Sequence, residues 1–265
     1  MIRAAAVAGR FYPGDAEALS RDLTERIDSS AQARSALGVL VPHAGYMYSG
    51  DVAGAVYSRI EFPETVILLG PNHSGEGAKV AVMTEGVWQT PLGQSAIDSE
   101  LAEAICGQST LATADARAHG KEHSLETQLP FLQFFKPDIK IVPICLSRLD
   151  WPSCQKFAQA ILSALGSRRV LIVASSDMSH YVSDATARRQ DALALHQLEA
   201  RDPQRLLETV RANQISMCGV VPATVMLVCA NALGARQCET ISYRTSGDVN
   251  GDLEHVVGYA GAVIR

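Results

Sequence analysis

Four side chains that can bind metals or move protons follow short apolar runs in this chain. His43 and His73 each come a few residues after such a run, and Asp177 and His180 come after a third. Apolar runs bounded by turn-forming residues are typical of buried strands, and ligands of open α/β sheets bind at the carboxyl ends of the strands. We therefore expect these side chains to converge on one edge of a sheet. The runs are residues 39–41, 65–69 and 170–174.

The two histidines suit a shared metal ion. Neutral imidazole is a common ligand of transition metals, so His43 and His73, at neighbouring strand ends, could hold one ion together. The alternative is that each makes ordinary hydrogen bonds within its loop. Asp177 and His180 could serve as a further ligand and as a general acid or base. Serines surround them, but the GxSxG motif of serine hydrolases is absent.

Two further histidines and one cysteine could also act as metal ligands, acids, bases or nucleophiles. His119 and His123 lie four residues apart without the HExxH order of zinc proteases, and we expect His119 to be a solvated loop residue. His123, at a predicted helix start, could act as an acid or base or donate to an anion. Cys218 lies just before a predicted helix that contains Pro222, where a lowered pKa would make it a metal ligand or nucleophile. The alternative is an inert buried thiol.

Composition limits the class of protein. The chain has 265 residues, a net charge of −5, an isoelectric point of about 5.8 and six scattered cysteines without a CxxC pair. This charge argues against nucleic acid as a partner, and the cysteine spacing argues against a structural zinc site. No apolar stretch is long enough for a membrane span, and the N-terminus is unlike a secretory signal. We expect a cytoplasmic protein without membrane association.

Predicted strands and helices alternate through most of the chain. This pattern favours one α/β domain over residues 1–265, with a mixed, mostly parallel sheet flanked by helices. Gly70 and Pro71 are expected to end the strand at 65–69. Ser49 is a candidate cap for a helix over 51–59, and Pro130 should either kink its helix or mark the first turn.

Several motifs, in order along the chain, resemble the Memo family, whose prokaryotic members are called AmmeMemoRadiSam system protein B. The resemblance runs from about residue 7 to the C-terminus. The motifs are His-Ala-Gly-Tyr at 43–46, Gly-Pro-Asn-His at 70–73, Glu-His-Ser-Leu-Glu at 122–126, Ser-Asp-Met-Ser-His-Tyr at 176–181, Cys-Gly at 218–219 and Thr-Ser-Gly-Asp at 245–248.

The resemblance implies a fold similar to the class III extradiol dioxygenases of LigB type, in which two histidines and a glutamate hold non-haem iron. The matching metal ligands here are His43, His73 and Cys218, the cysteine standing in place of the carboxylate. Asp177, His123 and His180 would line the same pocket as catalytic residues. The animal member of the family is linked to copper or iron binding, redox signalling and phosphotyrosine peptides.

These features predict a redox protein or oxidoreductase that binds one iron or copper ion, with zinc as a further candidate metal. A thiolate ligand is softer than a carboxylate and itself oxidisable, so dioxygenase chemistry does not follow from the fold alone. The alternatives are a non-catalytic module that binds a peptide or anion in a vestigial pocket, an extradiol-type dioxygenase, and a cysteine–histidine hydrolase. The partner is an unidentified small molecule or peptide, and the oligomeric state stays open.

Overall fold

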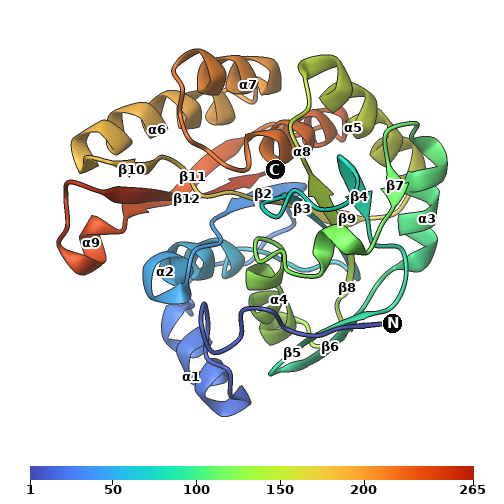
Figure 1. Ribbon diagram of the computed structural model, residues 1–265, viewed down its shortest axis with the longest axis horizontal. Coiled ribbons are helices and arrows are strands. Elements are labelled where there is room, and N and C mark those ends of the chain that lie inside the picture. Colours follow the sequence, from blue (N-terminus) through green and yellow to red (C-terminus); the bar gives the residue numbers. More distant parts are fainter.

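A nine-stranded mixed sheet forms the centre of the molecule, and helices cover both of its faces (Figure 1). The computed structural model describes residues 1–265. It confirms the expected α/β class and encloses one continuous hydrophobic core. None of the helices combines the length and the apolar character needed to cross a membrane.

The strands are β1 (Ile2–Arg3), β2 (Gly38–Val41), β3 (Thr65–Pro71), β4 (Val80–Val82), β5 (Val87–Thr90), β6 (Gly93–Ala96), β7 (Thr113–Ala114), β8 (Lys140–Leu146), β9 (Val170–Ser175), β10 (His180–Val182), β11 (Cys238–Thr245) and β12 (Val256–Ile264). The helices are α1 (Ala16–Arg26), α2 (Tyr46–Tyr57), α3 (Ser99–Gln108), α4 (Leu129–Phe135), α5 (Trp151–Leu165), α6 (Asp184–Glu199), α7 (Pro203–Ala212), α8 (Val220–Ala232) and α9 (Gly247–Asn250). Two short 3-10 helices span Arg117–His119 and Glu126–Gln128.

The parallel strands β2, β9, β3 and β8 lie side by side in that order and form the middle of the sheet. Their side chains are almost entirely buried, which explains their continuous apolar sequences. The sequence analysis expected His43 and His73 to follow neighbouring strands. This expectation is wrong, because β2 and β3 are not adjacent in the sheet. Strand β9, which leads to Asp177, lies between them.

Strand β3 continues through Gly70 and Pro71 instead of ending before them. Pro71 pairs with Leu146 of β8, whereas the pairing of β3 with β9 has already ended at Leu69. A proline is tolerated here because one side of the strand has no ladder to lose. A Cβ atom on Gly70 would lie 2.6 Å from the Ser124 Oγ. This glycine thus lets the segment around residue 124 pack closely against the end of β3.

Two predicted helix starts also need correction or refinement. Helix α2 begins at Tyr46, five residues before the predicted start, and Gly45 is its N-cap. Ser49 is inside the helix, where its hydroxyl donates to the Ala44 carbonyl at 2.8 Å. Pro130 lies in the first turn of α4, where its missing N–H has no helical partner to lose.

Candidate metal centre

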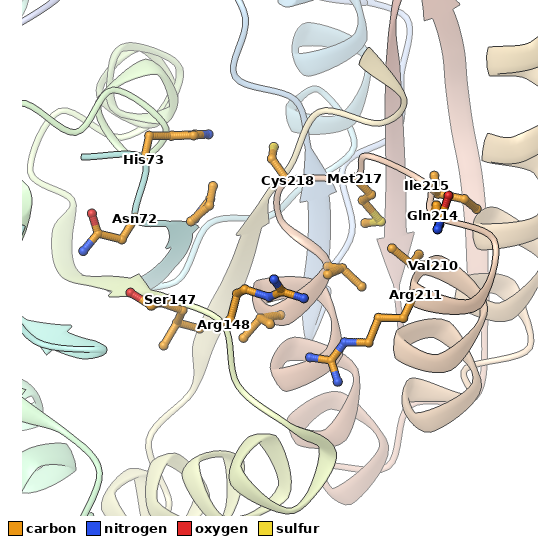
Figure 2. A pocket seen from close by; sticks show the side chains of 14 residues that line it. Asn72, His73, Ser147, Arg148, Val210, Arg211, Gln214, Ile215, Met217 and Cys218 are labelled. Atoms are coloured by element: carbon orange, nitrogen blue, oxygen red, sulfur yellow. The ribbon is translucent and has the colours of Figure 1, made fainter. Parts of the chain in front are cut away.

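Three potential metal ligands meet at the carboxyl edge of the central strands. His43 follows β2, His73 follows β3, and Cys218 lies in the connection that leads into α8. Each offers one ligand atom, and these three atoms all lie within 4.8 Å of one another. Figure 2 shows His73 and Cys218 facing the same space from two sides. The motif pattern predicted a shared site for His43 and His73, the family resemblance added Cys218, and the three ligand atoms lie close together in the structure.

The hydrogen bonds of His43 fix which ring nitrogen is free. Its Nδ1 lies 2.9 Å from the Ser175 Oγ, and this hydroxyl donates its single hydrogen to the Ser124 carbonyl at 2.7 Å. Ser175 must therefore accept from the Nδ1–H of His43. The Gln128 amide also donates to the Ser175 oxygen. The Nε2 of His43 consequently carries a lone pair, and it lies 3.3 Å from the Cys218 Sγ.

Glu122 has the same effect on His73. One carboxylate oxygen accepts the backbone N–H of His73 at 2.6 Å, and the other contacts the ring Nδ1 at 2.8 Å. Burial would raise the pKa of Glu122, but hydrogen bonds from His73 and Ser124, together with the charge of a protonated His73 ring, outweigh it and lower the pKa to about 2. An ionised carboxylate only accepts, so the neutral ring of His73 carries its proton on Nδ1 and has its lone pair on Nε2. A carboxylate that orients a ligating histidine in this way is typical of metal sites.

We predict that Glu122→Gln destabilises the metal-free protein at neutral pH. The lowered pKa of Glu122 means that its ionised form stabilises the folded state above about pH 4.5, and that this contribution disappears as the pH falls towards 2. The contribution is on the order of 3 kcal/mol. Urea unfolding between pH 7 and pH 2 should show a smaller pH dependence in the variant. Equal profiles for Glu122→Gln and the exposed control Glu25→Gln would contradict the prediction.

His123 belongs to the same cluster, whereas His180 stands apart. The rings of His73 and His123 stack with centroids 4.6 Å apart. Together with Glu122 they form a second group of possible metal ligands, whose ligand atoms lie within 4.8 Å of one another. Burial lowers the pKa of His123, which favours a neutral imidazole. His180 lies half-buried on β10, where its Nδ1 is 3.0 Å from the Ser216 carbonyl. It therefore lies beside the loop that carries Cys218 rather than among the three candidate ligands.

Asp177 follows the strand between the two histidines and contacts both His43 and Cys218. One of its carboxylate oxygens accepts the backbone N–H of His43 at 2.7 Å, and its own N–H points to the Cys218 Sγ at 3.3 Å. The second oxygen lies 4.0 Å from the Nε2 of His43. Burial raises the pKa of Asp177. The carboxyl group can thus position the ligands or exchange a proton close to them.

The expected low pKa of Cys218 is wrong for the protein without metal. Burial, followed by the nearby Asp177 carboxylate, raises the pKa of this thiol well above its ordinary range. The effect of helix α8 is outweighed because the thiol is largely surrounded by protein, although the residue remains partly exposed at a neighbouring cavity. Gly219 permits this placement, since a Cβ atom there would lie 2.2 Å from the Ser175 carbonyl oxygen. The sulfur lies 3.3 Å from the His43 Nε2, a position that suits a metal ligand better than an apolar packing role.

His119 is not a solvated loop residue. Its side chain is completely buried, and its Nδ1 lies 3.3 Å from the Cys145 Sγ. The loop is held inward because the Arg3 guanidinium donates to the His119 carbonyl. His119 therefore packs in the core, away from the cluster of His43, His73 and Cys218.

Comparison with known proteins agrees with the resemblance seen in the motifs. A family model described as Memo-like protein matches residues 3–263. The chain is 43% identical to a MEMO1 family protein of Archaeoglobus fulgidus, with 98% of each chain covered. It is 42% identical to one of Aquifex aeolicus, covering 99% of this chain and 98% of the relative. It is 39% identical to one of Methanopyrus kandleri, covering 100% and 99%.

Solved structures are also similar in fold. The crystal structure of an uncharacterized protein from Escherichia coli K12 matches with a TM-score of 0.53 and 13% sequence identity, covering 86% of this chain and all of the other. At this identity the likeness concerns the fold and carries no argument about the site.

Proposed function

The chain belongs to the Memo-like protein family, and we propose that it is a redox protein that holds one iron or copper ion with His43, His73 and Cys218. The observation that supports this most strongly is the mutual distance of the three ligand atoms, all within 4.8 Å. Metal–nitrogen bonds of about 2.0 Å and metal–sulfur bonds of about 2.3 Å place ligands on one ion roughly 3.5 Å apart. The 3.3 Å between the His43 Nε2 and the Cys218 Sγ suits that spacing.

The hydrogen bonds of the ligands support the same proposal. Ser175 and Glu122 form hydrogen bonds with the Nδ1 atoms of His43 and His73, so the Nε2 atom of each neutral ring is left to bind an ion. Two imidazoles and one thiolate form a ligand set that copper, zinc and iron all accept. Bound iron or copper would supply one-electron chemistry at a position that faces the adjoining cavity.

Neighbouring residues provide sites for proton transfer. Burial lowers the pKa of His123, so its ring is neutral near pH 7 and able to accept a proton. Burial raises the pKa of Asp177, which brings its carboxyl group closer to a protonated state than an exposed aspartate. His123 and Asp177 are therefore our candidates for proton exchange, with His180 at the edge of the site.

A cysteine–histidine hydrolase is the second candidate, because Cys218 and His43 lie within hydrogen-bond reach. Such an enzyme needs a thiolate beside an imidazolium. Burial raises the pKa of Cys218 and lowers that of His43, so both shifts oppose this ion pair. A metal ion, in contrast, can displace the thiol proton and bind a neutral imidazole. The short distance between Cys218 and His43, together with the raised pKa of the thiol and the lowered pKa of the imidazole, therefore favours metal binding over a hydrolase.

The test is the metal content of protein purified without oxygen. We expect about one iron or copper ion per chain, with the metal cycling between two oxidation states in a redox titration. Protein that binds neither metal, even after anaerobic reconstitution, would contradict the proposal. Oxygen uptake with a panel of catechols by the iron-loaded protein would instead identify a dioxygenase. Binding of a peptide by metal-free protein, lost in His123→Ala, would identify a binding module.

A further inference from the structure

A cavity with a cationic lining adjoins the candidate metal centre. It has a volume of about 570 Å³, and both His73 and Cys218 line it (Figure 2). This volume lies in the range of small-molecule sites. Two arginines and no acidic residue line the cavity, although the whole chain has a net charge of −5. An anion would therefore meet a locally positive site beside the metal ligands.

The two arginines reach the cavity from separate elements. Arg148 lies in the connection between β8 and α5, and Arg211 lies in the last turn of α7. In Figure 2 their guanidinium groups extend towards the space between these elements. One Nη of Arg211 donates to the Leu149 carbonyl, which fixes this side chain next to the backbone of Arg148. Neither guanidinium lies within salt-bridge distance of a carboxylate, although the charge of Asp150 acts on Arg211 from outside the cavity lining.

The remaining wall is largely apolar. Half of the lining residues are hydrophobic, and they include Leu146, Ile215, Met217 and Val221. Ile215 and Met217 are fixed in place because their side chains are buried in the core. The cavity therefore combines an apolar surface for a carbon skeleton with two cations that can each donate to a carboxylate or phosphate group. It lacks the glycine-rich loop that binds nucleotide phosphates.

We propose that this cavity binds a small organic anion, with an apolar body on the hydrophobic wall and its carboxylate or phosphate group held by Arg148 and Arg211. The proposal rests on the proposed function in one respect, because the body of the ligand would then face the metal held by His73 and Cys218. The proposed substrate class of the metal centre is therefore an amphipathic organic anion.

The test compares ligands of equal chain length by isothermal titration calorimetry. The probes are hexanoate and hexyl phosphate, with hexanol as the neutral control and inorganic phosphate as the control without an apolar body. We expect at least one of the two amphipathic anions to bind at least about tenfold more tightly than hexanol and inorganic phosphate. Preference for hexanoate would identify organic acids as the ligand class, and preference for hexyl phosphate would identify phosphate esters.

Variants locate the binding site. Arg148→Gln and Arg211→Gln should each weaken binding of the anion by about tenfold or more, because a charge-assisted hydrogen bond is lost. Arg169→Gln, which changes an exposed arginine outside this cavity, should leave it unchanged. Circular dichroism confirms that each variant is folded. Equal binding of hexanol and the anions, no binding of any probe, or unchanged binding in both arginine variants would overturn the proposal.

Metal analysis of the same samples separates the two proposals. Wild-type protein that contains metal but does not bind the anions contradicts only the anion site. Protein that lacks metal but loses anion binding in Arg148→Gln and Arg211→Gln supports the anion site and contradicts the metal-dependent function. Unchanged metal content in the arginine variants would show that their loss of binding is not caused by loss of metal.

Discussion

Replacing Cys218 by alanine should reduce the bound iron or copper from about one ion per chain to less than about a tenth of an ion. The thiolate is the only sulfur ligand within 4.8 Å of the ring nitrogens of His43 and His73 in this cluster. Without it two imidazoles remain, and such a pair binds metal weakly in competition with buffer. His43→Ala and His73→Ala should have the same effect. Elemental analysis after anaerobic purification measures it.

Matched controls separate ligand loss from general damage. Cys238→Ser changes a cysteine of β11, outside the cluster, and His255→Ala changes an exposed histidine; both variants should keep the wild-type metal content. Glu122→Gln keeps all three ligands but disturbs the orientation of His73, so we expect metal affinity to fall by about 10- to 100-fold. Wild-type metal content in all three ligand variants would remove the basis for the proposed site.

Replacing Glu126 by alanine should destabilise the fold by about 3 to 5 kcal/mol, the typical effect of breaking a buried ion pair. Glu126 is fully buried and forms a salt bridge with Arg3, which is also buried. Its carboxylate also accepts the backbone N–H groups of Ala6 and Val7 and the Tyr12 hydroxyl. The substitution leaves the Arg3 charge without its partner and releases the N-terminal segment. Urea unfolding gives the change in the free energy of unfolding.

A double substitution distinguishes a lost ion pair from lost packing. Arg3→Met combined with Glu126→Leu removes both charges and restores part of the volume, so it should be less destabilising than Glu126→Ala alone. The exposed Glu25→Gln should change stability by less than about 0.5 kcal/mol. A loss below about 1 kcal/mol for Glu126→Ala would show that the N-terminal segment is held mainly by other contacts.

The sequence predicted the strands of the central sheet well because their continuous apolar runs reflect burial on both faces. It also grouped His43, His73 and Cys218, although the cysteine was added through family resemblance and not through its spacing. The order of the strands could not be predicted from the sequence, because it depends on pairing between distant segments, which places β9 between β2 and β3. That order explains why Asp177, which follows β9, contacts His43, which follows β2.

The residues that the sequence analysis missed are those whose role depends on distant partners. Glu122 stands in a polar, charged segment, yet its side chain is buried and orients His73. Ser175 and Gln128 fix the tautomer of His43 through hydrogen bonds between segments more than forty residues apart. His119 was placed in solvent because its sequence neighbours are polar, whereas Arg3 and the core draw it inward. The only local signal was the density of titratable residues between 119 and 126.

X-ray absorption spectroscopy of the anaerobically prepared protein tests the central claim most directly, because it reports the atoms bound to the metal. We predict iron or copper with two nitrogen ligands at about 2.0 Å and one sulfur ligand at about 2.3 Å. The sulfur shell should disappear from the small fraction of metal that remains in Cys218→Ala. A spectrum of wild-type protein with only oxygen and nitrogen ligands, or a sulfur shell that persists in Cys218→Ala, would contradict the assignment.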